Sequence, residues 1–123
     1  MANPYNIDLD RNPANFQPLT PITFLERAAS VFPTHTAIVH GQLRYNYKEF
    51  YDRSRQIASA LIKNNIVSGD TVSVLLTNTP AMLECHYGIP MTGAVIHSIN
   101  TRLDAKTIAF QLDHALSLIH ISE

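Results

Sequence analysis

The feature that most constrains the fold is a strand–helix–strand pattern between Thr71 and Ile99. Residues 71–76 and residues 94–99 are nearly continuous runs of β-branched and apolar residues. Such runs are typical of strands covered on both faces in a parallel sheet. Residues 78–80, Asn-Thr-Pro, favour a helix start between the runs, and Gly93 favours a break before the second. The pattern predicts a βαβ unit with a right-handed crossover, and therefore an α/β fold.

Further elements are predicted on both sides of this unit. A helix is expected over residues 21–31, with Pro in the first helical position, and a β-hairpin over residues 37–45, with glycine in its turn. Asn46 followed by Glu49 is a capping-box pattern that predicts the start of a long helix. Asp104 is placed to cap one more helix.

Composition excludes several classes of protein. The 123 residues carry a net charge of -1, so no general electrostatic attraction favours nucleic acid. The apolar runs are too short to span a bilayer, for which about 20 residues are needed. The single cysteine, Cys85, cannot form an internal disulfide, and the first residues lack a secretory-signal pattern, so a cytoplasmic location is expected.

Local motifs for catalysis are weak. The four glycines are isolated, whereas a phosphate-binding loop needs several close together. The six histidines form no cluster at metal-ligand spacing, so no metal site is expected. Cys85 and His86 are neighbours, but adjacent helical side chains diverge, and a buried, inert thiol is the favoured interpretation. Glu84 is expected on a solvated helix face, like the charged residues Asp52, Arg53 and Arg55.

Four ordered segments resemble the opening of AMP-forming acyl-CoA synthetases of the adenylating superfamily. They are residues 19–29 (LTPITFLERAA), 36–41 (TAIVHG), 69–80 (GDTVSVLLTNTP) and 93–103 (GAVIHSINTRL). The resemblance runs from about Pro18 to His114 and is greatest to bacterial medium-chain or fatty acyl-CoA ligases and plant acyl-activating enzymes. It implies the amino-terminal part of the large domain of the adenylating-enzyme fold, containing the hairpin and the βαβ unit.

The resemblance also implies a reaction. A carboxylic acid and ATP form an acyl-adenylate, which CoA converts to acyl-CoA and AMP, and Mg²⁺ accompanies the ATP. The family's phosphate loop, adenine motif, ribose-binding aspartate and catalytic lysine have no counterpart here, and would lie beyond Glu123. No catalytic residue is therefore assigned. We expect an inactive fragment that lacks the remainder of the synthetase and binds neither ATP, Mg²⁺ nor CoA tightly.

Asn100, Thr101 and Arg102 correspond to a loop that borders the CoA-binding surface in some family members. The cationic Arg102 could meet a phosphate there, or form a surface ion pair with Asp104. These are the only candidate site residues from the sequence, and they are cofactor-binding rather than catalytic.

Three segments are expected in the chain. Residues 1–19 form an extended arm, residues 20–115 form a partial AMP-binding domain, and residues 116–123 form a tail that departs from the family pattern and resembles translated adapter sequence. Two alternatives to an inactive enzyme fragment remain open at this point. One is a small non-catalytic paralogue that binds a partner, and the other is a chain that binds ATP or CoA on its own.

Overall fold

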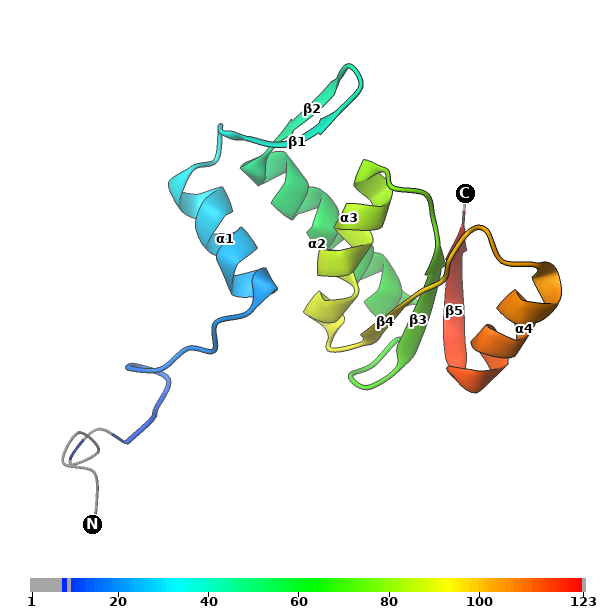
Figure 1. The fold of residues 1–123 in the computed structure, drawn as a ribbon. Coiled ribbons are helices and arrows are strands. Elements are labelled where there is room, and N and C mark those ends of the chain that lie inside the picture. The colour runs from blue at the N-terminus through cyan, green and yellow to red at the C-terminus, as the bar shows by residue number, and fades with distance from the viewer. Residues whose placement is uncertain (1–7, 9, 123) are drawn as a thin grey trace, which may run out of the picture.

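The βαβ unit predicted from the sequence lies at the centre of the fold (Figure 1). In the computed structural model, which describes residue 8 and residues 10–122, β3 (Thr71–Leu75) runs parallel to β4 (Val95–Ser98), and α3 (Pro80–Gly88) precedes β4. A further parallel strand, β5 (Ser117–Ser122), pairs with the other side of β3. The strand order is therefore β4-β3-β5, and the predicted α/β class is confirmed.

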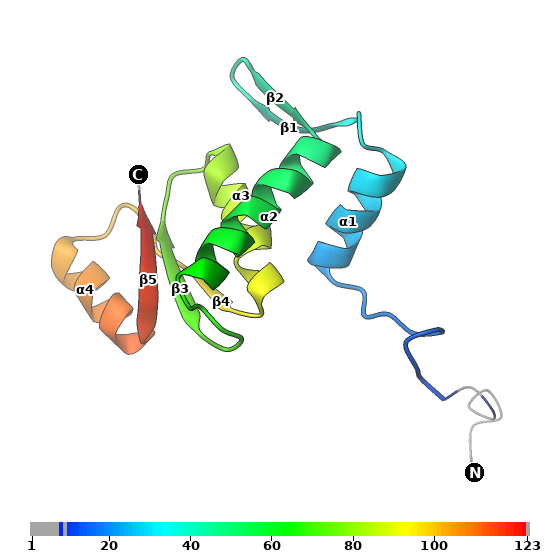
Figure 2. The same ribbon diagram turned by 180° about the vertical axis from the view of Figure 1, so that it is seen from behind.

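Helices cover both faces of this sheet. On one face α2 (Tyr47–Lys63) and α3 lie together, and α4 (Ala105–His114) lies on the other (Figures 1 and 2). Because side chains alternate along a strand, Val72 and Val74 face α2 and α3 and are fully buried. They contact a core formed chiefly by Leu61, Ile66, Cys85, Ile89 and Ala94.

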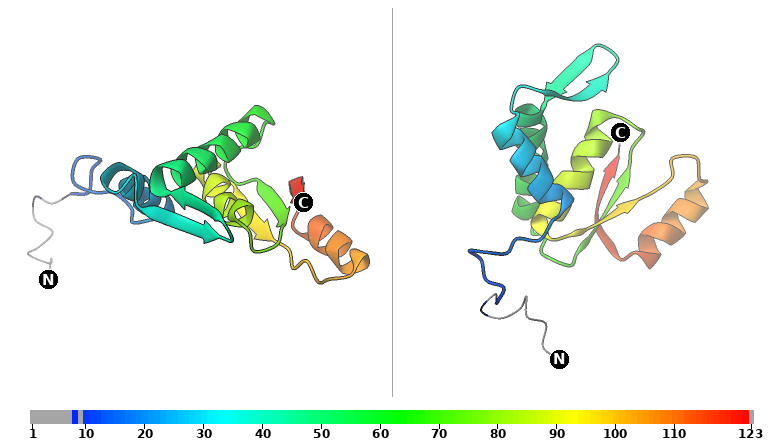
Figure 3. Two further views of the ribbon diagram at one scale, coloured as in Figure 1. Left: turned by 90° about the horizontal axis from the view of Figure 1, so that it is seen from above. Right: turned by 60° about the vertical axis from the view of Figure 1, so that its left-hand side comes forward.

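The hairpin and the first helix form a second unit beside α2 and α3. Strand β1 (Thr36–His40) pairs antiparallel with β2 (Leu43–Asn46), and Gly41 adopts the positive φ of 56° that the tight turn requires. Helix α1 (Pro21–Val31) has the predicted bounds. A smaller core of Leu25, Ile38 and Phe50 joins these elements, and the hairpin projects from it (Figure 3).

Side-chain caps determine where two helices begin. Asn46 accepts a hydrogen bond from the Glu49 N–H at 2.8 Å, and the Glu49 carboxylate accepts one from the Asn46 N–H at 2.8 Å. The predicted capping box is therefore confirmed. Thr20 caps α1, as its place before Pro21 predicts, and it forms a second reciprocal box with Thr23. The Thr23 half of this box was not predicted, because the third position usually holds Glu or Gln.

Helices α2 and α3 cross at very short range. A Cβ atom built on Gly88 would lie 2.7 Å from the Ser54 carbonyl oxygen and 2.8 Å from the Ile57 Cβ. Ser54 is fully buried, and its hydroxyl donates to the Phe50 carbonyl at 2.9 Å. The crossing therefore depends on small residues in both helices.

One expectation about the sheet was wrong. Residues 94–99 were expected to form a strand covered on both faces, yet Val95 is 54% exposed. The reason is topological: β5 occupies the other side of β3, so β3 is the central strand and β4 lies at an edge. Only the flanking residues Ala94 and Ile99 are buried.

The two terminal segments are described in part. Residues 10–19 contain a turn and neither helix nor strand, and the rest of the predicted arm lies outside the described residues except for residue 8. The segment expected as a non-native tail contains β5. Its origin stays a prediction, as do the domain boundaries. Among the described residues, no helix is long and apolar enough to cross a membrane.

Candidate functional site

The carboxyl ends of the parallel strands meet at one edge of the sheet. There β3 leads into the loop before α3, and β4 leads into the loop before α4. Ile99 is buried at this edge, and its N–H donates to the Val74 carbonyl at 2.9 Å. Because α3 and α4 lie on opposite faces, the chain changes direction across the sheet here, which is where open α/β sheets bind ligands.

The predicted residues Asn100, Thr101 and Arg102 lie on this edge, in the exposed loop after β4. The Asn100 side-chain oxygen accepts a hydrogen bond from the Arg102 N–H at 3.0 Å, which closes a local turn. The Leu103 N–H donates to the Asn100 carbonyl at 3.3 Å. Asn100 therefore shapes the loop, and Arg102 is exposed on it.

Asp104 is committed to the start of α4 rather than to Arg102. Its carboxylate accepts hydrogen bonds from the Thr107 N–H at 3.0 Å and the Thr107 hydroxyl at 2.7 Å. These bonds, the hydroxyl's first, hold the Asp104 pKa below its usual value. No ion pair joins Arg102 to Asp104 in the described part of the chain, so the surface-pair alternative is wrong.

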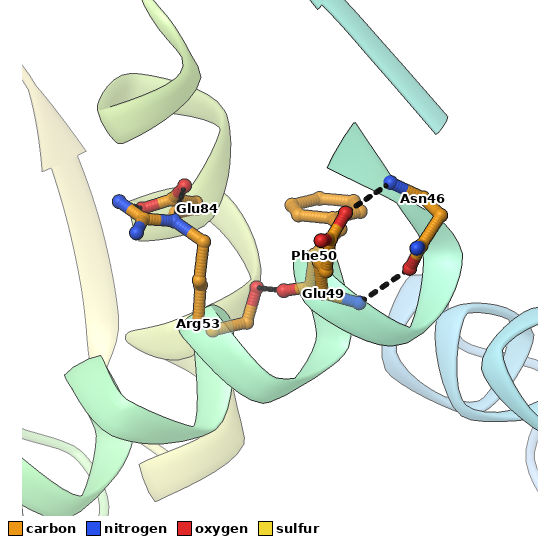
Figure 4. A network of polar contacts seen from close by, with 6 residues as sticks. Asn46, Glu49, Phe50, Arg53 and Glu84 are labelled. Carbon is orange, nitrogen blue, oxygen red and sulfur yellow. Dashed lines mark hydrogen bonds and ion pairs between the residues drawn. The ribbon is translucent and has the colours of Figure 1, made fainter. Parts of the chain in front are cut away.

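A partly buried ion pair links α2 to α3 (Figure 4). Arg53 Nε donates to Glu84 Oε1 at 2.5 Å, and a terminal guanidinium nitrogen donates to Oε2 at 3.2 Å. Glu84 is only 3% exposed, so its expected place on a solvated face was wrong. The physical reason is that the helix crossing covers Glu84 while Arg53, 31 residues earlier, supplies the compensating charge.

The same guanidinium reaches the hairpin. The Arg53 Cζ atom lies 5.0 Å from the centre of the Tyr45 ring on β2, a cation–π distance. The hydrogen bonds to Glu84 raise the Arg53 pKa, so the cation is permanent. Arg53 therefore connects β2, α2 and α3, and we call Tyr45, Arg53 and Glu84 the clamp.

An open pocket of about 370 Å³ lies between the hairpin and the start of α3. Its lining comes from β1, from the loop after β3 and from the first turns of α3: Ile38, Val39, His40, Asn78, Thr79, Pro80, Met82, Leu83 and His86. The pocket is mostly apolar, with histidines contributed by both the hairpin and α3. Sequence reasoning missed it because its walls are far apart in the chain.

A polar row crosses the α4 face of the sheet. Ser73 lies opposite His97 on β4 and His120 on β5. The Ser73 Oγ is 2.9 Å from His97 Nδ1, but Ser73 is only 1% exposed in mid-strand. The contact joins neighbouring strands β3 and β4, and we interpret the pair as structural.

The structure places the Cys85 thiol in the core, as the interpretation of a buried thiol expects. Cys85 is 2% exposed, and burial, with a smaller contribution from Glu84, raises its pKa to about 11. His86 Nδ1 lies 2.8 Å from the Met82 carbonyl, so it is not paired with the thiol. Among the described residues, no group of three or more His, Cys, Asp or Glu side chains could hold a metal ion.

Comparison with known proteins gives a consistent result. The profile of the AMP-binding enzyme family matches residues 25–122. The chain is 47% identical over 112 residues to an acetate/butyrate–CoA ligase of Arabidopsis thaliana, covering 91% of this chain and 20% of that protein. It is 50% identical over 108 residues to an acetate–CoA ligase of Humulus lupulus, covering 88% and 19%.

A solved structure shows the same architecture. The N-terminal domain of FACL13 from Mycobacterium tuberculosis has a TM-score of 0.78 and 30% identity, covering 81% of this chain and 26% of that domain. The chain therefore spans about a fifth of the length of the curated relatives it matches.

Proposed function

The chain belongs to the AMP-binding enzyme family, and from this premise we propose that it is the amino-terminal part of an ATP-dependent acyl-CoA ligase. The observation that carries the proposal is the identity of about half of the residues, over nearly all of the chain, to acetate– and butyrate–CoA ligases. The resemblance seen in the sequence and the adenylating-enzyme fold agree with it.

The proposed reaction of the whole ligase has two steps. A carboxylate oxygen attacks the α-phosphorus of ATP, forming an acyl-adenylate as pyrophosphate leaves. The CoA sulfur then attacks the acyl carbon, and AMP leaves as the thioester forms. Mg²⁺, when bound, offsets phosphate charge. The described residues contain no acidic cluster that fits Mg²⁺, so no step is assigned to a side chain of this chain.

The proposed role of the chain is to supply scaffold and part of the CoA surface. Asn100 fixes the turn after β4, and Arg102 places a cation at the carboxyl edge of the sheet. A guanidinium suits phosphate because its N–H groups can bind two oxygens together. The Asp104 carboxylate binds Thr107 and not the Arg102 guanidinium, which supports this assignment of Asn100, Thr101 and Arg102.

A chimera tests the proposal directly. Residues 18–114 would replace the matching part of the Humulus lupulus acetate–CoA ligase, and acyl-CoA formation would be measured. We expect an active chimera, with Arg102→Ala raising KM for CoA more than Arg102→Lys. A folded but inactive chimera would contradict the proposal.

The chain alone is expected to be inactive. Hydroxamate trapping of acyl-adenylate, with ATP and a panel of short-chain and aromatic acids, should give no product above a blank. The intact Humulus lupulus enzyme serves as the positive control. Turnover by the isolated chain would contradict this part of the proposal.

A non-catalytic partner-binding protein is the second candidate. Large apolar side chains lie exposed on α1, α4 and the turn before β5, as expected of surfaces covered by other protein: Phe24, Val31, Phe110 and Leu116. This candidate requires a cooperatively unfolding chain that forms a defined complex. Denaturant unfolding with no cooperative transition would exclude it.

For location we propose the cytoplasm, as the sequence suggested. Several relatives carry the word peroxisomal in their names, so a peroxisomal location is the competing outcome. Microscopy of a fluorescent fusion to the intact protein, beside a peroxisomal marker, decides between the two.

A further inference from the structure

We propose that a groove between α1 and α2 binds a small, soluble phosphate monoester that carries an apolar body. The groove has a volume of about 470 Å³, within the range of about 300–1,000 Å³ that is usual for ligand sites. Its walls are Ile22 on α1, one face of α2, and Met91 on the short 3-10 helix η2 (Pro90–Thr92). Helices α1 and α2 lie side by side (Figure 2). The proposal is independent of the ligase assignment.

Four side chains of α2 that can donate hydrogen bonds form a row along the groove. They are Tyr51, Arg55, Ser59 and Lys63, which follow one another at intervals of four residues. Residues four apart are neighbours on a helix, and the rise of 1.5 Å per residue places them about 6 Å apart along its axis. The helix therefore fixes their spacing, with Arg55 and Lys63 one turn on either side of Ser59.

The positive charge of this row is not compensated. No Asp or Glu among the described residues lines the groove, and neither Arg55 nor Lys63 forms an ion pair there. Asp52 on the same helix is paired with Lys48, and Glu26 on α1 lines a different groove. Two unpaired cations match the charge of a phosphate monoester, about −1.5 to −2 at pH 7, better than the single charge of a carboxylate.

The donors are positioned for an anion beside Ser59. The Arg55 Cζ atom lies 5.6 Å from the centre of the Tyr51 ring, a cation–π distance that orients the guanidinium and leaves its N–H groups for phosphate oxygens. The Ser59 hydroxyl has no hydrogen-bond partner within the described residues. Ser59 also precedes the last turn of α2, within which the unfavourable charge of the helix end is confined.

The apolar part of the groove determines the body of the ligand. Ala58 is buried at its base, and Ile62 is 58% exposed beside the polar row. Ile22 and Met91 are half-buried on the facing walls. A hydrocarbon group seated here would remove this apolar surface from water, which is favourable in proportion to the area covered.

The groove is distinct from the proposed CoA surface. Lys63 ends α2 just before the loop that leads into β3, and Met91 precedes β4. These are the amino ends of the parallel strands, whereas Arg102 lies in the loop after the carboxyl end of β4. Because the groove is a hollow between helices, it suits a small molecule that enters it better than the flat surface of a membrane.

The experiment is calorimetric titration of the 123-residue chain with octyl phosphate. We expect one site, weakened about tenfold by Arg55→Ala and by Lys63→Ala, because each removes a charge-assisted contact. Lys106→Ala is the matched control, since it removes an exposed cation from α4, outside the groove, and should bind like the wild type. Ile62→Ala should weaken octyl phosphate about threefold and leave methyl phosphate unchanged, because only the longer ligand covers residue 62.

Circular dichroism shows whether each variant is folded before its affinity is interpreted. Inorganic phosphate and 1-octanol each match one half of the groove, and each should bind at least about tenfold more weakly than octyl phosphate. Vesicles of phosphatidylcholine and phosphatidic acid should not sediment the chain, which separates a soluble ligand from a lipid surface. An equal loss in Lys106→Ala, 1-octanol binding as tight as that of octyl phosphate, or sedimentation that depends on Arg55 would overturn the proposal.

Discussion

Glu84 is a carboxylate whose burial depends on one partner. The side chain is almost fully enclosed, while Arg53 remains 44% exposed. Taking a carboxylate out of water is costly unless a cation and hydrogen bonds compensate it. The two members of the pair are therefore unequal, since water can rehydrate Arg53 more easily than Glu84.

Removing Arg53 should destabilise the fold more than removing a member of an exposed ion pair does. We expect Arg53→Ala to lower the free energy of unfolding by roughly 2–3 kcal/mol, below the usual cost of breaking a buried pair because water partly screens this one. Urea unfolding measures the loss. Lys48→Ala is the matched control, since Lys48 forms an exposed pair with Asp52 at 2.6 Å and should cost about 0.5 kcal/mol or less. Equal losses in the two variants would contradict the expectation.

The stabilising contribution of Asp104 to the start of α4 should decrease as the pH falls. Its pKa is lower in the folded state, so its contribution is complete above the unfolded pKa of about 3.9 and is lost as the pH falls through the folded value. Thermal unfolding between about pH 5 and pH 2 should show this loss. Asp104→Asn keeps a capping oxygen without a titrating group, so its stability should fall less over the same range. Parallel curves for the two proteins would argue against the assignment.

Local sequence signals predicted where helices and strands lie along the chain, but they did not predict the order of the strands in the sheet. Pro, Gly and capping residues placed α1 and the start of α2 correctly, because these signals act within a few residues. The edge position of β4, the strand β5 and the Arg53–Glu84 pair depend on contacts between distant segments. The CoA role of Asn100, Thr101 and Arg102 stays a prediction, since it depends on surfaces outside these residues.

The α2–α3 crossing predicts an unusual response to alanine. Gly88→Ala should improve intrinsic helix propensity, yet destabilise the chain by roughly 1–3 kcal/mol, because the added methyl group meets a backbone carbonyl that cannot move aside. Urea unfolding measures the change. Adding Ile57→Ala removes the contact with the Ile57 Cγ2 atom but leaves the Ser54 carbonyl oxygen and the Cβ of residue 57 in place, so it should not restore stability. A Gly88→Ala variant more stable than the wild type would contradict this account.

Seen as a whole, the described chain has sheet edges without the usual protection. Neither β4 nor β5 contains a charged residue or proline, and the outer side of each is unpaired by any described strand. Such edges pair readily with other chains. Exposed Leu118 on β5 adds apolar surface at one of them.

Self-association should therefore respond to one charge on β5. We expect the isolated chain to form concentration-dependent oligomers in light scattering after size exclusion, and Leu118→Lys to shift it towards monomer. Ile62→Lys adds the same charge at an exposed position on α2, away from the sheet edges, and should not have this effect. Equal effects of the two substitutions would point to net charge rather than to strand pairing.

The rate at which the buried Cys85 thiol is chemically modified should report how often the core opens locally. At pH 8 a group with a pKa of about 11 is almost entirely protonated, and it lies out of reach of a water-soluble disulfide reagent. Modification should wait for α3 to lift from the sheet, so its rate reports how often that opening occurs. The rate should rise in Gly88→Ala and Arg53→Ala but not in Lys48→Ala, with no label or engineered probe required.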